Sequence, residues 1–409
     1  MSVFSATTID RLNKTRDHQT GARPMIDRRK FLNEVAFVAT SSTLPLVRPE
    51  GLQAAREPTP DFNDQVAHIL ANVRRANGRF PGMVAAIVRE GRPIGIAAEG
   101  VRKVGSPERV EVTDQFHLGS CTKAMTSTMI ASLVDSGKLR WDSTLASVFP
   151  DEAGKMHADY RAVTLDQLLR HRAGLPSDVD WNGVPQALSP TLQRRSLLAS
   201  ALGGSPETAP GAAFGYSNLG YALAGLMAEE ATATPWEDLL RRLVFEPMGM
   251  TSAGFGPPGS DRNVDQPWGH RSFGPIFSPT RLDNPPVIGP AGTVHASLVD
   301  WAKFASFHLG DGSANGRRIL RPETLRKLHA VSPGEDYAHG WIVPNRNARP
   351  NGPTWEHGGS NTVWFAMIVL APERRFGVLA ATNAGGSFPQ RACLEVVEAL
   401  EKLEPTTRA

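Results

Sequence analysis

One stretch of this sequence decides how the rest is interpreted, and it reads Phe116-His117-Leu118-Gly119-Ser120-Cys121-Thr122-Lys123. It places a serine and a lysine three residues apart at the start of an apolar segment. Positions i and i+3 lie on one face of a helix, so the Lys123 amine can reach the Ser120 hydroxyl. A serine hydroxyl becomes a good nucleophile only when a neighbouring base takes its proton, and a lysine can be that base if its pKa is lowered. The stretch therefore predicts a nucleophile with an adjacent base.

The residues that follow supply the burial that such a base needs. Residues 124–134 carry no charge, and the segment ends at Asp135-Ser136-Gly137, where the glycine is typical of a helix stop. An isolated Ser-x-x-Lys pair is a weak signal, because roughly one is expected by chance in a chain of this length. Taken alone it favours an ordinary helix start with an exposed lysine, so the decision depends on motifs further along the chain.

Composition describes a globular protein with a neutral main part. The chain has 409 residues, of which 41% are hydrophobic and 21% charged. The formal charge of +3 lies within residues 1–55, which hold 8 basic and 5 acidic residues, while the remainder holds 36 of each. We therefore expect no nucleic-acid partner. Cys121 and Cys393 cannot build a disulfide framework and are expected to be small core residues.

The N-terminal part predicts a leader over residues 1–55. Residues 1–24 are polar and lack apolar periodicity, which is typical of disorder. Met25 to Asn33 contains Asp-Arg-Arg-Lys-Phe-Leu and resembles a twin-arginine export signal, with Met25 as an alternative start. The apolar run 35–47 has the length of a signal's hydrophobic region and is too short to span a bilayer. We therefore expect export to the periplasm or another extracytoplasmic compartment, with no stable membrane span. A basic amphipathic lead-in helix is the alternative, favoured by Glu34 and by the lack of a clean cleavage motif.

Strand-like patterns occur near both ends of the remaining chain. Residues 61–78 have helical spacing, and two strands follow at 83–89 and 93–100 around a Glu-Gly-Arg turn. Further strands are predicted near the C-terminus, followed by a last helix: 340–343, 354–357, 363–370, 376–383 and the helix 388–403.

The middle of the chain lacks strand-like alternation. It contains predicted helical segments that proline and glycine interrupt: 165–170, 191–202, 220–231 and 235–244. Its last part, 256–290, is rich in proline and glycine and is expected to be a long surface connection. The order of elements predicts an α+β fold, with an antiparallel sheet built from both ends of the chain, flanked by helices and carrying a mostly helical insertion. We expect one domain over 56–405, with an α/β part at about 58–139 and 287–403 and a helical part at about 140–286.

A second motif, Gly215-Tyr216-Ser217-Asn218, lies in a predicted loop before a helix. The Tyr216 hydroxyl could relay a proton if a nearby ammonium lowers its pKa, and Asn218 could donate to a substrate carbonyl and accept from Lys123. Locally, a helix N-cap by Ser217 or Asn218 explains the same residues.

A third motif, His357-Gly358-Gly359-Ser360, lies at the end of one predicted strand and before the next. Glycines there let the backbone approach a ligand closely, and the amides of Ser120 and Ser360 could form an oxyanion hole for acyl transfer. A glycine-rich turn beside a core histidine is an equally good local explanation.

In order and spacing, the three motifs resemble those of the serine β-lactamase and penicillin-binding-protein superfamily. The resemblance is closest to the branch that holds class C β-lactamases, D-aminopeptidases and related esterases, and it covers roughly residues 62–402. Further segments look like recurring parts of that branch: Leu168 to Pro176, Pro210 to Phe214, Phe245 to Thr251 and Gly289 to Thr293.

The resemblance implies a role for each motif residue. Ser120 would be the acylated nucleophile and Lys123 its base, while Tyr216 would shuttle the proton to the leaving group and activate the deacylating water. Asn218 would position the substrate carbonyl and Lys123. In the third motif His357 stands where the family usually has the lysine of Lys-Thr-Gly, and Gly358 replaces a hydroxyl residue. Gly359 and Ser360 match the family pattern, and the Ser120 and Ser360 amides would form the oxyanion hole.

These departures affect the expected substrate. A lysine in the third motif is a permanent cation that binds the carboxylate of lactams and D-Ala-D-Ala peptides, whereas His357 is largely neutral near pH 7. We therefore expect a serine hydrolase without a cofactor or metal, acting on small esters or amides rather than as an efficient β-lactamase. The acyl and leaving-group pockets are expected in loops such as 177–190 and 256–290, and the oligomeric state is left open.

The sequence disfavours two other classes of protein and is compatible with a third. An α/β-hydrolase needs Gly-x-Ser-x-Gly, and both candidate serines, Ser217 and Ser360, lack the final glycine. The 11 histidines form no His-x-His or His-x-x-x-His pair, which argues against a metalloenzyme. A non-hydrolytic penicillin-binding-type sensor or a D-Ala-D-Ala carboxypeptidase on the same fold is the remaining alternative.

Overall fold

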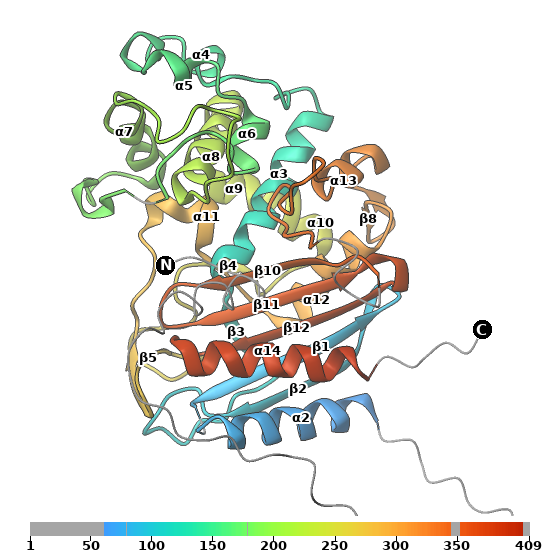
Figure 1. The fold of residues 1–409 in the computed structure, drawn as a ribbon. Helices are drawn as coiled ribbons and strands as arrows, with labels where there is room; N and C mark the ends of the chain where they lie inside the picture. The colour runs from blue at the N-terminus through green and yellow to red at the C-terminus, as the bar shows by residue number, and fades with distance from the viewer. Residues whose placement is uncertain (1–60, 79, 178, 345–351, 404–409) are drawn as a thin grey trace, which may run out of the picture. The chain divides into compact units, whose positions relative to one another are not determined.

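The computed structural model of this chain describes residues 61–78, 80–177, 179–344 and 352–403 (Figure 1). From Asp61 onward the chain forms one compact unit. The expected leader, with its twin-arginine signal, lies outside the described residues, so export stays a prediction. Within the described part of the chain, no helix is both long enough and apolar enough to cross a membrane.

A five-stranded antiparallel sheet forms the centre of this unit, with strand order β10-β11-β12-β1-β2. β1 pairs with β12 so that Met83 lies opposite Thr382, which joins the two ends of the chain and confirms the predicted sheet. The strand bounds are β1 Gly82–Arg89, β2 Arg92–Gly100, β10 Trp355–Ser360, β11 Phe365–Ala371 and β12 Phe376–Thr382.

Helices cover both faces of the sheet, because alternate residues of β1 enter two different cores. Met83 and its same-face neighbours pack against α2 (Phe62–Ala76) and α14 (Ser387–Glu401). Val84 and its same-face neighbours pack into a larger core that includes α3 (Thr122–Asp135) and α12 (Leu298–Leu309). A strand buried on both faces reads as a continuous apolar run, which is how β1 appears in the sequence.

The middle of the chain adds helices that lie together beyond α3, away from the sheet (Figure 1). The expected helical segments near 165, 191, 220 and 235 are all present. The bounds are α4 Leu145–Val148, α5 Ala158–Arg161, α6 Leu165–Leu169, α7 Pro190–Leu202, α8 Asn218–Thr232, α9 Trp236–Leu240, the π-helical turn η4 Arg241–Phe245, α10 Glu246–Met248, α11 Gly289–Gly292 and α13 Pro322–Leu328. Short 3-10 turns occupy Gly119–Cys121, Ala153–Lys155, Trp181–Gly183, Pro286–Ile288 and Pro372–Arg374.

The structure corrects the expectation that residues 140–286 contain no strands. β5 (Gly269–Phe273) and β6 (Ile276–Thr280) form a hairpin within the segment expected to be an irregular surface connection. β4 (Gly254–Phe255) joins β3 (Gln115–His117) and β7 (Val294–Ser297) in a small sheet. These strands are too short, and the hairpin too exposed, to show the alternation by which a strand is recognised. A further two-residue pair joins β8 (Ser313–Ala314) and β9 (Arg317–Arg318).

The prediction of a strand at 340–343 is also wrong. Ile342 makes only isolated bridges, to Tyr337 and to Glu356. Its neighbour Trp341 is fully buried in the larger core, so the apolar character of this run reflects packing against helices rather than membership of a sheet.

Candidate active site

Ser120 and Lys123 meet at the start of α3, as the motif predicts. The turn Gly119–Cys121 leads directly into α3, which begins at Thr122. The Lys123 Nζ lies 3.1 Å from Ser120 Oγ, 2.9 Å from Asn218 Oδ1 and 2.8 Å from the carbonyl oxygen of Ala291. Ser120 and Lys123 are both buried, with 8% of Ser120 still exposed. The second motif is therefore joined to the first by a direct hydrogen bond.

Burial changes the ionisation of Lys123. Desolvation of the fully buried amine lowers its pKa from 10.5 to about 7, because the charged form loses its hydration. A neutral amine has two hydrogens and one lone pair. The acceptors Asn218 Oδ1 and Ala291 O take the two hydrogens, which leaves the lone pair for the proton of Ser120. This arrangement suits a general base.

Tyr216 lies beside this amine, but its ionisation differs from the sequence-based expectation. Its ring centroid is 4.8 Å from Lys123 Nζ, and its hydroxyl is buried. Ser120 is close enough to favour the phenolate slightly, although no hydrogen bond of ordinary geometry joins the two hydroxyls. Burial is the larger effect and raises the pKa of Tyr216 above its usual range, so the expected lowering by an ammonium is wrong. Tyr216 is a neutral phenol that can donate a proton.

The helix cap in the second motif is Ser217, whose Oγ accepts from the backbone N–H of Gly220 at 3.3 Å. Asn218 is the first residue of α8, and its side chain points to Lys123 instead. The helix cap and the contact with Lys123 therefore come from adjacent residues, while the chemical role of this motif stays a prediction.

His357 lies inside β10, which continues three residues beyond the predicted strand end at 357, and it is fully buried. Its Nδ1 donates to the Gly358 carbonyl at 2.7 Å, and its Nε2 accepts from the Tyr337 hydroxyl at 3.1 Å. Desolvation, with a smaller contribution from Lys123, lowers the pKa of His357 to about 3. The side chain is therefore neutral at pH 7, as the sequence suggested. Tyr337 was missed by sequence analysis, because it belongs to no motif and is close to His357 only through the fold.

The third motif reaches the Ser120 turn through a glycine contact. A Cβ on Gly359 would lie 2.0 Å from the Leu118 carbonyl and 2.7 Å from Ser120 N, and a Cβ on Gly119 would lie 2.3 Å from Ser360 N. Gly119 also has φ of +51°, which favours glycine. Only glycines allow the two backbone segments to pack so closely. The segments that carry the Ser120 and Ser360 amides are therefore in direct backbone contact.

A pocket of about 520 Å³ adjoins this site. Its wall includes Asp283, whose Oδ1 lies 2.8 Å from Nε2 of His117, three residues before the nucleophile. The lining comes from the two loops where the sequence analysis expected substrate pockets: Val179, Asp180, Trp181, Gln186, Asp283, Asn284, Pro285 and Pro286.

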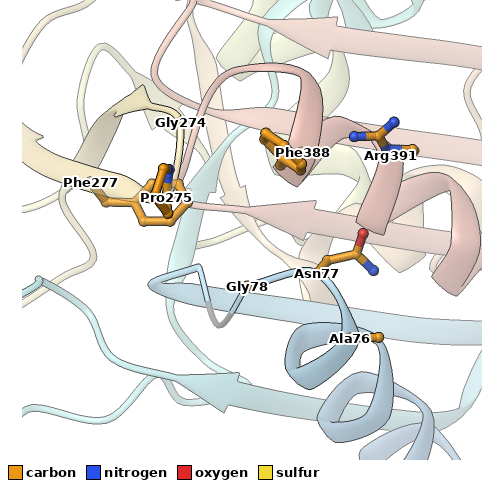
Figure 2. A pocket seen from close by; sticks show the side chains of 8 residues that line it. All are labelled: Ala76, Asn77, Gly78, Gly274, Pro275, Phe277, Phe388 and Arg391. Carbon is orange, nitrogen blue, oxygen red and sulfur yellow. The ribbon is translucent and has the colours of Figure 1, made fainter.

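A second pocket, of about 230 Å³, lies between the end of α2, the β5–β6 turn and the start of α14 (Figure 2). Those two helices cover the sheet face opposite α3, so this pocket does not adjoin Ser120. Among the residues that the structure describes, no group of three His, Cys, Asp or Glu side chains could hold a metal ion. Cys121 and Cys393 are both free and buried, as expected.

Comparison with known proteins gives consistent matches over this region. The family model described as Beta-lactamase matches residues 62–400. Penicillin-binding protein 4 of Amycolatopsis lactamdurans is 28% identical over 327 residues, which is 76% of this chain and 83% of that protein. Unguisins hydrolase ungD' of Aspergillus campestris is 26% identical over 74% of this chain, and the chain spans only 58% of it.

Solved structures share the fold. The octameric penicillin-binding protein homologue from Pyrococcus abyssi has a TM-score of 0.67 at 22% identity, covering 83% of this chain and 77% of that one. The D-alanine carboxypeptidase AmpC from Burkholderia cenocepacia has a TM-score of 0.67 at 20% identity, covering 83% and 99%. At these identities the likeness supports the α+β architecture and no particular substrate.

Proposed function

Because this chain belongs to the Beta-lactamase family, we propose that it is a serine hydrolase that forms and then hydrolyses an acyl intermediate on Ser120. The observation that carries the proposal is the environment of Lys123. A buried amine with a pKa of about 7, both hydrogens engaged and its lone pair directed at Ser120 Oγ, is prepared to accept the serine proton. General-base assistance of this kind contributes about 10²- to 10⁴-fold to a rate.

In the proposed acylation, Lys123 takes the proton of Ser120 while Oγ attacks the carbonyl carbon of an ester or amide. The carbonyl oxygen becomes an oxyanion, which the backbone N–H groups of Ser120 and Ser360 would stabilise by about 3 kcal/mol each. The intermediate then expels the alcohol or amine, which receives a proton from Lys123 through Tyr216. Because Tyr216 stays neutral, it passes a proton on rather than abstracting one by itself.

In deacylation, water attacks the acyl carbonyl carbon and gives a proton to Lys123 through Tyr216. The bond between that carbon and Ser120 Oγ then breaks, and Oγ takes the proton back from Lys123. Asn218 has two tasks in this scheme. Its Oδ1 accepts from Lys123 and fixes the amine, and its amide nitrogen remains to contact the substrate carbonyl. The products are a carboxylic acid and the free enzyme.

The third motif favours esters and amides over carboxylate-bearing lactams. His357 is buried, neutral and hydrogen-bonded to Tyr337, so it offers no cation for a substrate carboxylate. We therefore propose esterase or D-amino-acid amidase activity, with D-Ala-D-Ala carboxypeptidase activity or non-hydrolytic penicillin binding as the alternative.

A substrate panel tests the proposal. Wild type and Ser120→Ala are incubated with a short-chain nitrophenyl ester, a D-alanyl anilide and a chromogenic cephalosporin, with Ser132→Ala, further along α3, as the matched control. We expect ester or anilide turnover in wild type and Ser132→Ala, little cephalosporin turnover, and none in Ser120→Ala. Rapid cephalosporin hydrolysis would overturn the substrate preference, and covalent labelling without turnover of any substrate would favour a penicillin-binding sensor.

A further inference from the structure

Asp283 lies where nitrogen atoms of three residues, His117, Asn284 and Asn361, converge on one carboxylate oxygen. Its Oδ1 is 2.8 Å from His117 Nε2 and 2.8 Å from Asn361 Nδ2, and it accepts from the backbone N–H of Asn284 at 2.7 Å. The side chain is 11% exposed. Burial alone would raise the pKa of this carboxyl, but the partners, His117 foremost, hold it below its usual value. Asp283 is therefore an ionised carboxylate with a defined set of contacts.

The first contact leads to the nucleophile. His117 Nδ1 accepts a hydrogen bond from the backbone N–H of Gly119 at 3.1 Å. An imidazole nitrogen that accepts carries no proton, so the His117 proton lies on Nε2, the atom that faces Asp283. Nε2 and Oδ1 are 2.8 Å apart, so the ring and the carboxylate are in direct polar contact. Asp283 thereby fixes the ring that orients the backbone immediately before Ser120.

The second contact leads to the other oxyanion donor. Asn361 directly follows Ser360. Its Nδ2 donates to Asp283, and its Oδ1 accepts a hydrogen bond from the backbone N–H of Val363 at 3.3 Å. Ser360 Oγ accepts from the Thr362 N–H at 3.0 Å, so the turn after β10 is held by side chains on both sides. Asp283 thus contacts this turn through Asn361 and the segment before Ser120 through His117.

The segment that contains Asp283 is also connected to Lys123, the proposed base. Next to Asp283, the Asn284 side chain donates to the Gly292 carbonyl at 2.7 Å, and the preceding carbonyl, of Ala291, accepts from Lys123. We propose that Asp283 is a positioning residue that holds the Ser120 and Ser360 backbone amides in register for the oxyanion, through His117 on one side and Asn361 on the other. The inference rests on the proposed acyl-Ser120 chemistry and adds a residue that belongs to none of the three motifs.

This role predicts a specific kinetic signature. The oxyanion exists only in the transition state and the tetrahedral intermediate. Displacement of the Ser120 and Ser360 amides should therefore lower kcat and leave KM nearly unchanged. A displacement of about 1 Å in a reacting geometry costs on the order of 10²-fold in rate. Asp283→Ala is therefore expected to lose roughly 10²-fold in kcat on a nitrophenyl ester, and to lose affinity for phenylboronic acid, a tetrahedral analogue, by a similar factor.

The test compares Asp283→Ala, Asp283→Asn and Asn361→Ala in the full chain. An asparagine at 283 keeps an acceptor oxygen for His117 and Asn361, so Asp283→Asn should retain most of the boronate affinity and kcat. Asn361→Ala removes one arm independently, and its combination with Asp283→Ala should lose less than the product of the single losses. Asp261→Ala is the matched control, since Asp261 is an exposed carboxylate that pairs with Arg281 at 2.9 Å.

Equal boronate affinity in wild type and Asp283→Ala would overturn the inference while the proposed function stands. An equal loss in Asp283→Asn and Asp283→Ala, accompanied by a lower Tm, would also overturn it, because that pattern indicates a fold effect. A wild-type protein that neither acylates on the ester nor binds the boronate would overturn the proposed function and this inference together.

Discussion

The proposed base makes a quantitative prediction for the pH dependence of acylation. Lys123 has a pKa lowered by burial to about 7, and only its neutral form can accept the Ser120 proton. The acylation rate should therefore rise tenfold per pH unit below pH 7 and level off above it. At pH 6 about one tenth of the amine is neutral, so the rate should be about tenfold below its plateau.

Five titratable groups close to the amine have pKa values far from this midpoint. Burial lowers the pKa of His357 to about 3 and that of His171 well below its usual value, and it raises those of Tyr216, Tyr221 and Cys121 above theirs. None of these five groups therefore produces a midpoint near 7 in the acylation rate.

The same pKa makes an independent prediction for stability. The fall of the Lys123 pKa from 10.5 to about 7 means that the folded state disfavours the protonated amine by on the order of 5 kcal/mol, at about 1.4 kcal/mol per pKa unit. Between pH 7 and 10.5 the unfolded state binds the proton and the folded state does not, so stability rises with pH by about 1.4 kcal/mol per unit in this window. Below pH 7 both states are protonated and this contribution is flat.

Lys123→Met removes both effects. Its acylation rate should fall by about 10²-fold or more at pH 8. The variant should also lack the wild-type rise in unfolding free energy between pH 7 and 9. Rapid-quench kinetics of a nitrophenyl ester and urea unfolding at several pH values measure the two quantities. Wild-type acylation that keeps its plateau down to pH 5, or a variant with the same pH slope of stability as wild type, would refute the assignment.

Two further substitutions test the packing around and behind the site. Gly359→Ala places a methyl group 2.0 Å from the Leu118 carbonyl, so the backbone must move and the acylation rate should fall by on the order of 10²-fold. Gly204→Ala, which has open space around it, should leave the rate unchanged. A Gly359→Ala variant with the wild-type rate would show that the two amides do not need this close backbone contact. Arg194→Met leaves the buried Glu229, paired at 2.6 Å, without its cation and should lower the free energy of unfolding in urea by about 3–5 kcal/mol. Arg140→Met, in the exposed pair with Asp142, should not change this free energy measurably. Equal losses in the two variants would contradict the role assigned to burial.

The sequence was informative where function requires fixed residue types at fixed spacing. The Ser120 to Lys123 contact and the link to Asn218 follow from motifs that a single chain displays. The central sheet was equally accessible, because β1, β11 and β12 are continuous apolar runs of strand length. Periodicity and motif order therefore predict the architecture and the position of the nucleophile.

Features that depend on distant contacts could not be predicted. Asp283 and Tyr337 reach His117 and His357 only after the chain has folded, and nothing in their local sequence marks them. The raised pKa of Tyr216 is also a property of burial, which its motif does not reveal. The β5–β6 hairpin was missed because its exposed strands carry no alternation. The residues that position or shift the pKa of the reacting groups are thus harder to predict from the sequence than the residues that perform the proposed chemistry.

The most direct test of the central claim is the mass of the protein during turnover. Wild type is mixed with a nitrophenyl ester, quenched in acid within milliseconds to seconds and digested, and the peptide that contains Ser120 is sequenced by mass spectrometry. We predict an acyl adduct on Ser120 that decays as the acid product appears, with neither adduct nor turnover in Ser120→Ala. Turnover that persists in Ser120→Ala, or an adduct on another residue, would contradict the account.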